Sequence, residues 1–254
     1  MKRILCLLLG LALFGPAHPQ TVDVAIGKMA ILSLIGDEMT VDTYRPRVGT
    51  GIDSNHQESI AVPGPVFDHA ALFAAADSLA RLIPAASVSA LAVPVAGSAS
   101  DPNWLLADGP IPPSSALVSS LRQSGFSHLL LISKHLGLAR LKLKDIAVGS
   151  GHLRGIGFYI DHDLRTKRSD TNEAAHGFIA AYVYIRLTLV DLSTLEVRGE
   201  QTISASSTWS AARNENGFDP WGAMTPEQKV ASLKRLIEKN VSASVPLLVR
   251  VKAP

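Results

Sequence analysis

The sequence has little charge and almost no cysteine. Only 18% of its 254 residues are charged, 47% are hydrophobic, and one is a cysteine. So apolar a composition excludes an intrinsically disordered chain, and one cysteine excludes a scaffold held by disulfides. A net charge of +2 gives no basic footprint for nucleic acid. The length allows one large domain or two small ones.

Long hydrophobic runs are also absent, except near the amino terminus. Residues 4–14 form an apolar run, preceded by two basic residues and followed by small residues up to Ala17. This order is typical of a secretory signal peptide. The run of about a dozen residues is shorter than the roughly 20 that a membrane-spanning helix needs. We therefore expect a signal peptide at 1–17, with cleavage after Ala17 or as late as Gln20, rather than a membrane anchor.

The single cysteine is Cys6, at the start of the apolar run, whereas the lipidated cysteine of a lipoprotein follows such a run. Cleavage would remove this thiol, so we expect a periplasmic or secreted protein that is not a lipoprotein. Without Lys2 and Arg3, the mature chain would carry 22 basic and 22 acidic residues and would be formally neutral.

In the first half, short apolar runs predict strands at 25–35, 39–48, 88–93 and 128–133. The first two are expected to form a hairpin, with the second at an edge of the sheet because Pro46 cannot donate to a ladder. Residues 49–65 are predicted to be a loop.

Apolar residues at helical spacing predict two helices in this half. The first covers 68–83 with Asp68 as its cap, and the second begins at Ser114 or Ser115 and ends before Gly125. Between them, residues 96–113 contain four prolines and are expected to be a long loop that is either functional or mobile.

The second half favours strands, predicted at 138–144, 153–160, 177–192 and 196–208. Glycines at 155 and 157 weaken the second of these, and residues 165–172 are expected to be a charged surface loop. A turn at 191–194 joins the last two strands as a hairpin.

A final helix is predicted at 227–244, with Thr225 as its cap and Pro226 in its first turn. Residues 245–251 are expected to be a short strand or an apolar tail. The order of elements predicts an α/β (α+β) fold: a mixed, mostly antiparallel sheet with about three packing helices. We expect a single domain over 25–251, in preference to a second domain beginning near residue 136.

The strand that ends at 192 carries a further signal. Residues 182–197 read Tyr-Val-Tyr-Ile-Arg-Leu-Thr-Leu-Val-Asp-Leu-Ser-Thr-Leu-Glu-Val. Following a β-α-β-α-β half and preceding a helix, this segment resembles the α/β module of envelope lipoproteins. The element order is similar to that of the curli-secretion channel lipoprotein family and of the amino-terminal domain of the Tol-system periplasmic protein. The chain lacks their lipobox cysteine, and the resemblance assigns no functional residue.

The densest cluster of metal-ligand types is Asp161-His162-Asp163, with His152 upstream and His176 downstream. In an extended segment Asp161 and Asp163 would face one side and His162 the other, so the triplet cannot chelate as a unit. A metal would need His152 or His176 to converge on it across a hairpin. A solvated strand end is favoured instead, because no compact metal-binding motif is present.

Other polar residues give weaker signals. His128 and His135 flank a predicted strand and could act as general bases by type, but neither has an evident partner. Residues 149–152, Gly-Ser-Gly-His, lack the spacing and the following helix of a nucleophile elbow. Three tryptophans could anchor a partner or cover an edge of the core: Trp104, Trp209 and Trp221. Three basic residues share one strand face and favour edge protection over contact with an anionic envelope surface: Arg140, Lys142 and Lys144.

These observations favour a non-enzymatic binding or assembly module of the bacterial cell envelope, with no catalytic residue, metal or cofactor assigned. Its partner would be another envelope protein or a small ligand, and the oligomeric state is left open. The alternative is a periplasmic, metal-dependent hydrolase that uses the residues around Asp161. A third hypothesis is a small-ligand binder with residues 96–113 as a lid.

Overall fold

The computed structural model describes residues 27–46, 55–91, 116–143, 146–167, 174–210 and 219–249. Within them, three α-helices pack against a mixed, mostly antiparallel sheet, which confirms the α+β class. The expected signal peptide and the loop at 96–113 lie outside the described residues and stay predictions.

The strands are β1 (Lys28–Leu34), β2 (Glu38–Thr43), β3 (His56–Ala61), β4 (Ser87–Leu91), β5 (His128–Lys134), β6 (Leu136–Leu138), β7 (Leu141–Leu143), β8 (Ile146–Val148), β9 (His152–Lys167), β10 (Ala174–Asp191) and β11 (Val197–Ser210). The helices are α1 (Val66–Leu82), α2 (Ala116–Gln123) and α3 (Pro226–Leu248), with a short 3-10 turn, η2 (Trp221–Ala223), before α3.

Strand β10 organises the sheet because it pairs along both of its edges. Strand β11 follows one edge in the antiparallel direction. The other edge is shared, since β9 pairs with the first half of β10 and β5 with the second half. Strands β2 and β3 extend the sheet beyond β9, and β1 and β4 extend it beyond β5.

The expected hairpin between the first two strands is wrong. Strand β1 pairs in parallel with β4 and β5, whereas β2 pairs with β9 and β3. A continuous apolar strand such as β1 is buried on both faces and is typical of a strand between parallel neighbours. The predicted loop at 49–65 contains β3, which is almost entirely exposed and therefore has no apolar pattern. The edge strand is β3 and not β2.

Strand β9 is longer than expected, because it includes residues 165–167 of the predicted surface loop. Its Gly157 is required by close packing, since a Cβ there would lie 1.9 Å from the Thr40 carbonyl oxygen of β2. The single strand expected at 138–144 is instead divided between β6 and β7, with Ala139 and Arg140 between them.

The helices follow the sequence prediction except at their ends. Asp68 does not cap α1: its carboxylate accepts hydrogen bonds from the backbone N–H groups of Ile35 and Gly36 after β1. Thr225 caps α3 through a capping box with Gln228, as expected.

The strand or tail expected at 245–251 is wrong, because α3 continues through Pro246 to Leu248. Proline has no N–H, so the carbonyl of Ser242 loses its helical partner. The Ser78 hydroxyl of α1 donates to that carbonyl at 3.2 Å and replaces the missing bond.

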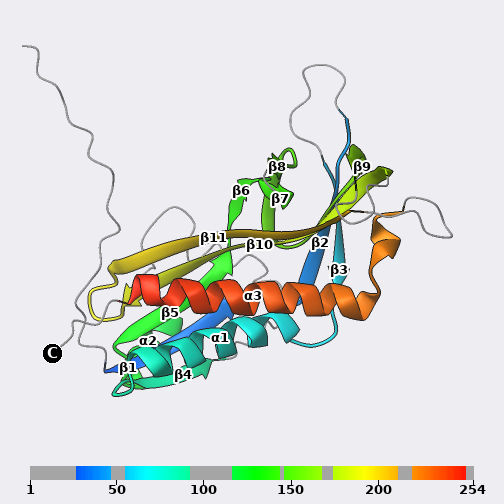
Figure 1. Cartoon of the computed structure of the whole chain (residues 1–254). Coiled ribbons are helices and arrows are strands. Elements are labelled where there is room, and N and C mark those ends of the chain that lie inside the picture. Colours follow the sequence, from blue (N-terminus) through cyan, green and yellow to red (C-terminus); the bar gives the residue numbers. More distant parts are fainter. Residues whose placement is uncertain are drawn as a thin grey trace, which may run out of the picture.

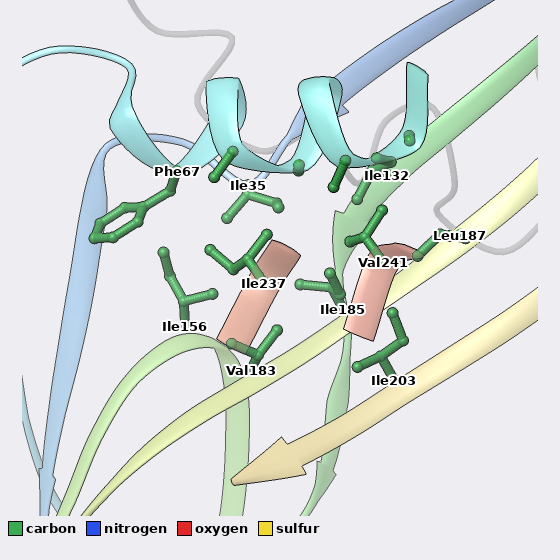
Figure 2. Packing of buried hydrophobic residues seen from close by; sticks show 14 of the residues in the cluster. Ile35, Phe67, Ile132, Ile156, Val183, Ile185, Leu187, Ile203, Ile237 and Val241 are labelled. Carbon is green, nitrogen blue, oxygen red and sulfur yellow. The ribbon is translucent and has the colours of Figure 1, made fainter. Parts of the chain in front are cut away.

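The two faces of the sheet are covered differently (Figure 1). We call the face under α1 and α3 the helical face; Figure 2 shows its apolar core, where Ile237 and Val241 of α3 meet Val183, Ile185 and Leu187 of β10. The opposite face, the split face, is covered by α2 at one end and by β6, β7 and β8 at the other. We call these three strands and their connecting residues the β6–β8 lobe.

Candidate functional site

The predicted metal ligands do not converge. His152 and Asp161 lie nine residues apart on β9, a separation of about 30 Å along an extended strand. His176 on β10 pairs with Arg165, four residues beyond Asp161. In the described part of the chain, no group of three or more His, Cys, Asp or Glu side chains could hold a metal ion.

The segment that begins at Asp161 is a bulge, so the expected alternation of Asp161 and Asp163 on one side is wrong. Three residues of β9 oppose Gly177 alone, because the register moves between His176 and Phe178. Asp161 is buried, and its Oδ1 accepts hydrogen bonds from the N–H groups of Asp163 (2.8 Å) and Leu164 (2.9 Å). His162 and Asp163 are both exposed. The Asp161 carboxylate therefore stabilises the bulge.

Among the residues that the structure describes, the most deeply buried acidic side chain is Asp42 on β2, which is fully inaccessible. The Tyr182 hydroxyl donates to its Oδ2 at 2.5 Å, and the Gln57 amide donates to its Oδ1 at 2.6 Å. Burial raises the pKa of Asp42, and it raises the pKa of the Tyr182 hydroxyl further. Because the pair is inaccessible to a substrate, we assign it a structural role. It links β2 to β10 across Gly157 of β9, the strand between them.

Two further tyrosines fasten the β6–β8 lobe to the split face. The Tyr184 hydroxyl donates to the Leu138 carbonyl at 2.9 Å and accepts from the Arg140 N–H at 3.0 Å. The Tyr159 hydroxyl accepts from the Ser150 N–H at 3.1 Å. Leu141 of the lobe is fully buried against this layer of rings. These hydroxyls have structural partners and are not available as acids or bases.

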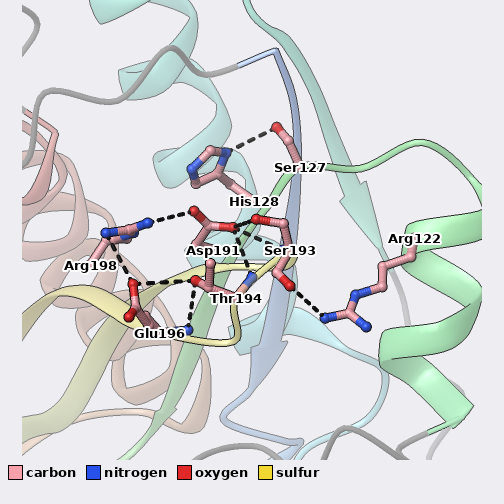
Figure 3. A network of polar contacts seen from close by, with 8 residues as sticks. All are labelled: Arg122, Ser127, His128, Asp191, Ser193, Thr194, Glu196 and Arg198. Carbon is pink, nitrogen blue, oxygen red and sulfur yellow. Dashed lines mark hydrogen bonds and ion pairs between the residues drawn. The ribbon is translucent and has the colours of Figure 1, made fainter.

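Figure 3 shows the polar network at the β10–β11 turn. Asp191 Oδ1 accepts from the hydroxyl and the N–H of Ser193, at 2.6 and 2.8 Å, and Oδ2 accepts from Arg198 at 2.9 Å. The Ser193 hydroxyl, followed by Arg198, holds the pKa of the Asp191 carboxyl far below its usual range. The network closes a turn in which Leu195 takes a left-handed conformation, and the predicted turn at 191–194 is confirmed.

His128, beside this network, is 4% exposed. Its Nδ1 lies 2.9 Å from the Ser127 hydroxyl oxygen, and that hydroxyl donates to the Lys28 carbonyl at 3.1 Å. The hydroxyl hydrogen is thus used, so His128 Nδ1 donates to the Ser127 hydroxyl oxygen. The other ring nitrogen, Nε2, is buried and has no hydrogen-bond partner. Burial lowers the pKa of His128, with Asp191 opposing the shift. A buried neutral imidazole without access to solvent is a structural group, so its proposed role as a general base gains no support.

Between α2 and the lobe, the split face carries polar side chains. Ser133 and Thr188 are buried, and neither hydroxyl has a hydrogen-bond partner. Next to them, Arg186 contacts His135 Nδ1 at 3.2 Å and Glu200 at 3.4 Å. Burial and the Arg186 charge lower the pKa of His135. His135, one of the candidates from the sequence, therefore has a charged neighbour within hydrogen-bond distance.

A groove lies between the start of β11 and the last turn of α3. It has a volume of about 240 Å³ and is lined by residues 197–201 together with Leu247 and Leu248. Consecutive residues of a strand point to opposite faces, so five in a row line a groove only where it runs along the edge of the strand. Val197 and Leu247 are each 53% exposed there.

The charged side chains of this groove already have partners within the chain. Arg198 pairs with Asp191 (2.9 Å) and Glu196 (3.2 Å), and Glu200 pairs with Arg186 (3.4 Å). Gly199 allows helix and strand to approach, because a Cβ at this position would lie 3.2 Å from Leu248 Cδ2. The surface left for a ligand consists mainly of backbone and aliphatic side chains, together with the side chain of Gln201.

Strand β11 also has an open edge. Among the described strands only β10 pairs with it. From Gln201 to Ser210 it contains no charged residue and no proline, the features that usually protect an edge. The β6–β8 lobe touches β11 near its middle, where the Lys142 N–H donates to the Ser206 hydroxyl at 2.9 Å. The groove at 197–201 lies nearer the turn. Sequence analysis missed the groove, and the uncharged run that follows it in β11 does not mark its position.

The tryptophans within the described residues cover the core. Trp209 and Trp221 pack against the apolar cluster of the helical face, and Trp221 also contacts the Phe158 ring. The Lys229 ammonium lies 3.9 Å from the centre of the Trp221 ring. Trp104 lies outside the described residues. None of the described helices is long and apolar enough to span a membrane.

Three solved structures are similar to this chain at low sequence identity. A neuraminyllactose-binding hemagglutinin homolog from Helicobacter pylori has 10% identity and a TM-score of 0.43, with 93% of this chain and 92% of that chain covered. A DUF330 protein from Xanthomonas campestris has 12% identity and a TM-score of 0.37, over 91% and 86% of the two chains. The PelC dodecamer from Paraburkholderia phytofirmans has 14% identity and a TM-score of 0.29, over 93% and 94%.

None of these three is a curli-secretion lipoprotein or a Tol-system protein, so the resemblance expected from residues 182–197 is not confirmed. No protein-family model matches the sequence, and no curated protein matches it.

Proposed function

We propose that this protein is an exported binding module of the bacterial cell envelope that captures an extended polypeptide by strand addition. The peptide would pair with the open edge of β11 at residues 197–201 and place an apolar side chain in the groove against Leu247. The observation that carries the proposal is a groove along an edge of β11 with which no described strand pairs. Main-chain pairing supplies affinity in this mode, and the side-chain pocket supplies specificity.

The size and charge of the groove support a polypeptide over a small ligand. A volume of about 240 Å³ is below the usual range for pockets that enclose drug-sized molecules. It suits one or two aliphatic side chains of a peptide. Because Arg198 and Glu200 are paired within the chain, we expect recognition to depend weakly on the charge of the peptide.

A hydrolase receives less support. The perturbed titratable groups Asp42 and His128 are buried, and each is held by neighbours within the fold. The metal hypothesis named three side chains that are exposed in the structure: His152, His162 and Asp163. They do not form a metal site with Asp161, whose carboxylate accepts hydrogen bonds from the backbone of the bulge.

Export is supported by the basic and apolar pattern before Ala17. Cell fractionation of the full chain is expected to place it in the periplasm or the medium, and a chain without residues 1–17 is expected to stay in the cytoplasm. Finding the full chain in the cytoplasm would contradict export.

Peptide capture can be tested by selecting ten-residue peptides from a random display library on the purified protein without residues 1–17. We expect the enriched peptides to have apolar residues at alternate positions. Because they would pair with β11 through their backbone, methylating alternate peptide amides should abolish binding. Val197→Asp and Leu247→Asp are expected to weaken binding at least tenfold. Phe73→Asp is the matched control, because Phe73 is an equally apolar exposed side chain on α1 outside the groove. Peptides that bind the groove variants normally would contradict the proposal, as would a selection that enriches none.

A further inference from the structure

The β6–β8 lobe holds exposed aliphatic side chains in a fixed position. Leu136 and Leu138 of β6 are 58% and 53% exposed, and Ile146 of β8 is 60% exposed. They are half of the large hydrophobic side chains that the described residues expose, and they lie within one small substructure. In Figure 1 the lobe projects from the side of the sheet opposite α1 and α3.

The outward direction of these side chains is built into the fold. A Cβ at Gly137 would lie 3.1 Å from the ring of Tyr184, so the backbone of β6 rests directly on that ring. Leu136 and Leu138 flank Gly137 and therefore point away from the sheet. The Tyr184 hydroxyl fixes the same segment through Leu138 and Arg140.

The charge of the lobe is mostly positive. Arg140, Lys142 and Arg154 are exposed around the aliphatic side chains, and Leu136 pairs with Arg154 in the sheet register. In the sequence, residues 136–154 carry four basic side chains and one acidic side chain, that of Asp145. This contrasts with the rest of the chain, in which acidic and basic residues nearly balance.

We propose that the β6–β8 lobe docks on an anionic lipid surface. Aliphatic side chains beside basic ones are the chemistry of interfacial membrane binding, in which the aliphatic groups enter the headgroup boundary and the cations attract anionic lipid. A protein interface would instead have few charges at its centre, whereas the sequence of this lobe has a net excess of three basic residues. Docking through the split face leaves the β11–α3 groove, on the side of α3, open to a peptide, so this inference does not depend on peptide capture.

Vesicle co-sedimentation of the purified protein without residues 1–17 tests the proposal. Vesicles of phosphatidylethanolamine with 30% phosphatidylglycerol are compared with vesicles of phosphatidylcholine alone. We expect binding to the anionic vesicles, which weakens as salt is raised, and at least tenfold weaker binding to the neutral ones.

Two double variants separate the apolar and basic contributions. Leu136→Ser with Leu138→Ser is expected to weaken binding at least tenfold. Arg140→Gln with Lys142→Gln is expected to weaken it about 25-fold, since each cation near an anionic surface contributes about fivefold. Phe73→Ser, which removes an exposed aromatic ring from α1, should leave binding unchanged. Unchanged thermal unfolding midpoints would show that the variants are folded. Absence of vesicle binding, or equal binding by the lobe variants and the wild type, would overturn the proposal.

Discussion

The helical face and the split face of one sheet are stabilised by different means. Under α1 and α3 the core is a continuous aliphatic layer, to which Ile185, Ile237 and Val241 contribute. The split face instead combines two smaller apolar clusters with buried hydroxyls and a buried carboxylate. The split face is covered by two separate elements, α2 and the β6–β8 lobe. Because the lobe is held by hydrogen bonds as well as by apolar contacts, this face buries more polar groups than the helical face does.

The largest effect is expected in the helical face. Ile237→Ala removes a fully buried side chain between α3 and the sheet and should lower the free energy of unfolding by about 3 to 4 kcal/mol. Urea denaturation followed by circular dichroism measures this loss. A loss below about 1 kcal/mol would mean that this layer is no better packed than the split face.

The next effect is expected at the carboxylate of the split face. Tyr182→Phe removes the hydroxyl that donates to Asp42 and should cost about 2 kcal/mol at pH 7. Burial already raises the pKa of Asp42, so the variant carboxyl should take up a proton more readily and its deficit should shrink as the pH falls. Urea denaturation of both proteins at pH 7 and pH 4.5 tests this; a deficit that grows at low pH would be contrary to it.

Acid should destabilise the fold through His128, which shares the side of β5 that carries Leu130 and Ile132 of the helical face. Its pKa is lowered in the folded protein, so below the ordinary value of 6.5 the unfolded chain binds a proton that the folded chain does not. Stability is therefore retained above about pH 6.5 and is lost as the pH falls from there toward the folded pKa, by at most about 1.4 kcal/mol per pH unit for one group. The His128→Asn variant should show a flatter profile between pH 7 and 5. If the pH profile of stability is unchanged in this variant, His128 is not the cause of the acid sensitivity. His135 would then be the next candidate, because its pKa is also lowered.

The smallest effect is expected at a hydroxyl without a partner. Thr188→Val replaces a buried, unpaired hydroxyl with a methyl group of similar size and should stabilise the protein by about 0.5 to 1 kcal/mol. Thermal unfolding with calorimetry measures the gain. Ser133→Ala serves as the matched control, since it removes the other unpaired hydroxyl but also some packing. A loss of more than 1 kcal/mol at Thr188 would show that its hydroxyl is bonded.

The elements that were predicted correctly from the sequence are those determined by residues close together in the chain. Alternation in 177–192 and the Thr225-Pro226 start are sufficient to place β10 and α3, because the residues that determine them are neighbours in sequence. Strand β3 has no apolar pattern and is held by backbone pairing with β2 and by side-chain hydrogen bonds such as that from Gln57 to Asp42. The passage of α3 through Pro246 depends on Ser78, which is 164 residues from the carbonyl that it satisfies.

The candidate site was harder to predict for the same reason. The cluster around Asp161 has the right residue types, but a bulge that depends on Gly177 directs the carboxylate to the backbone. The groove needs Val197 and Leu247 to meet, and these residues are 50 positions apart in the sequence. Sequence patterns identify chemistry-bearing residues, whereas this surface is made mainly of backbone and aliphatic groups.

Amide hydrogen exchange with and without a selected peptide tests most directly whether the β11–α3 groove is the binding site. Strand addition predicts that the amides of residues 197–201 gain protection when the peptide binds, while those of the β6–β8 lobe and of α1 do not change. Protection confined to the lobe or to the residues around Asp161, with no change in β11, would contradict it.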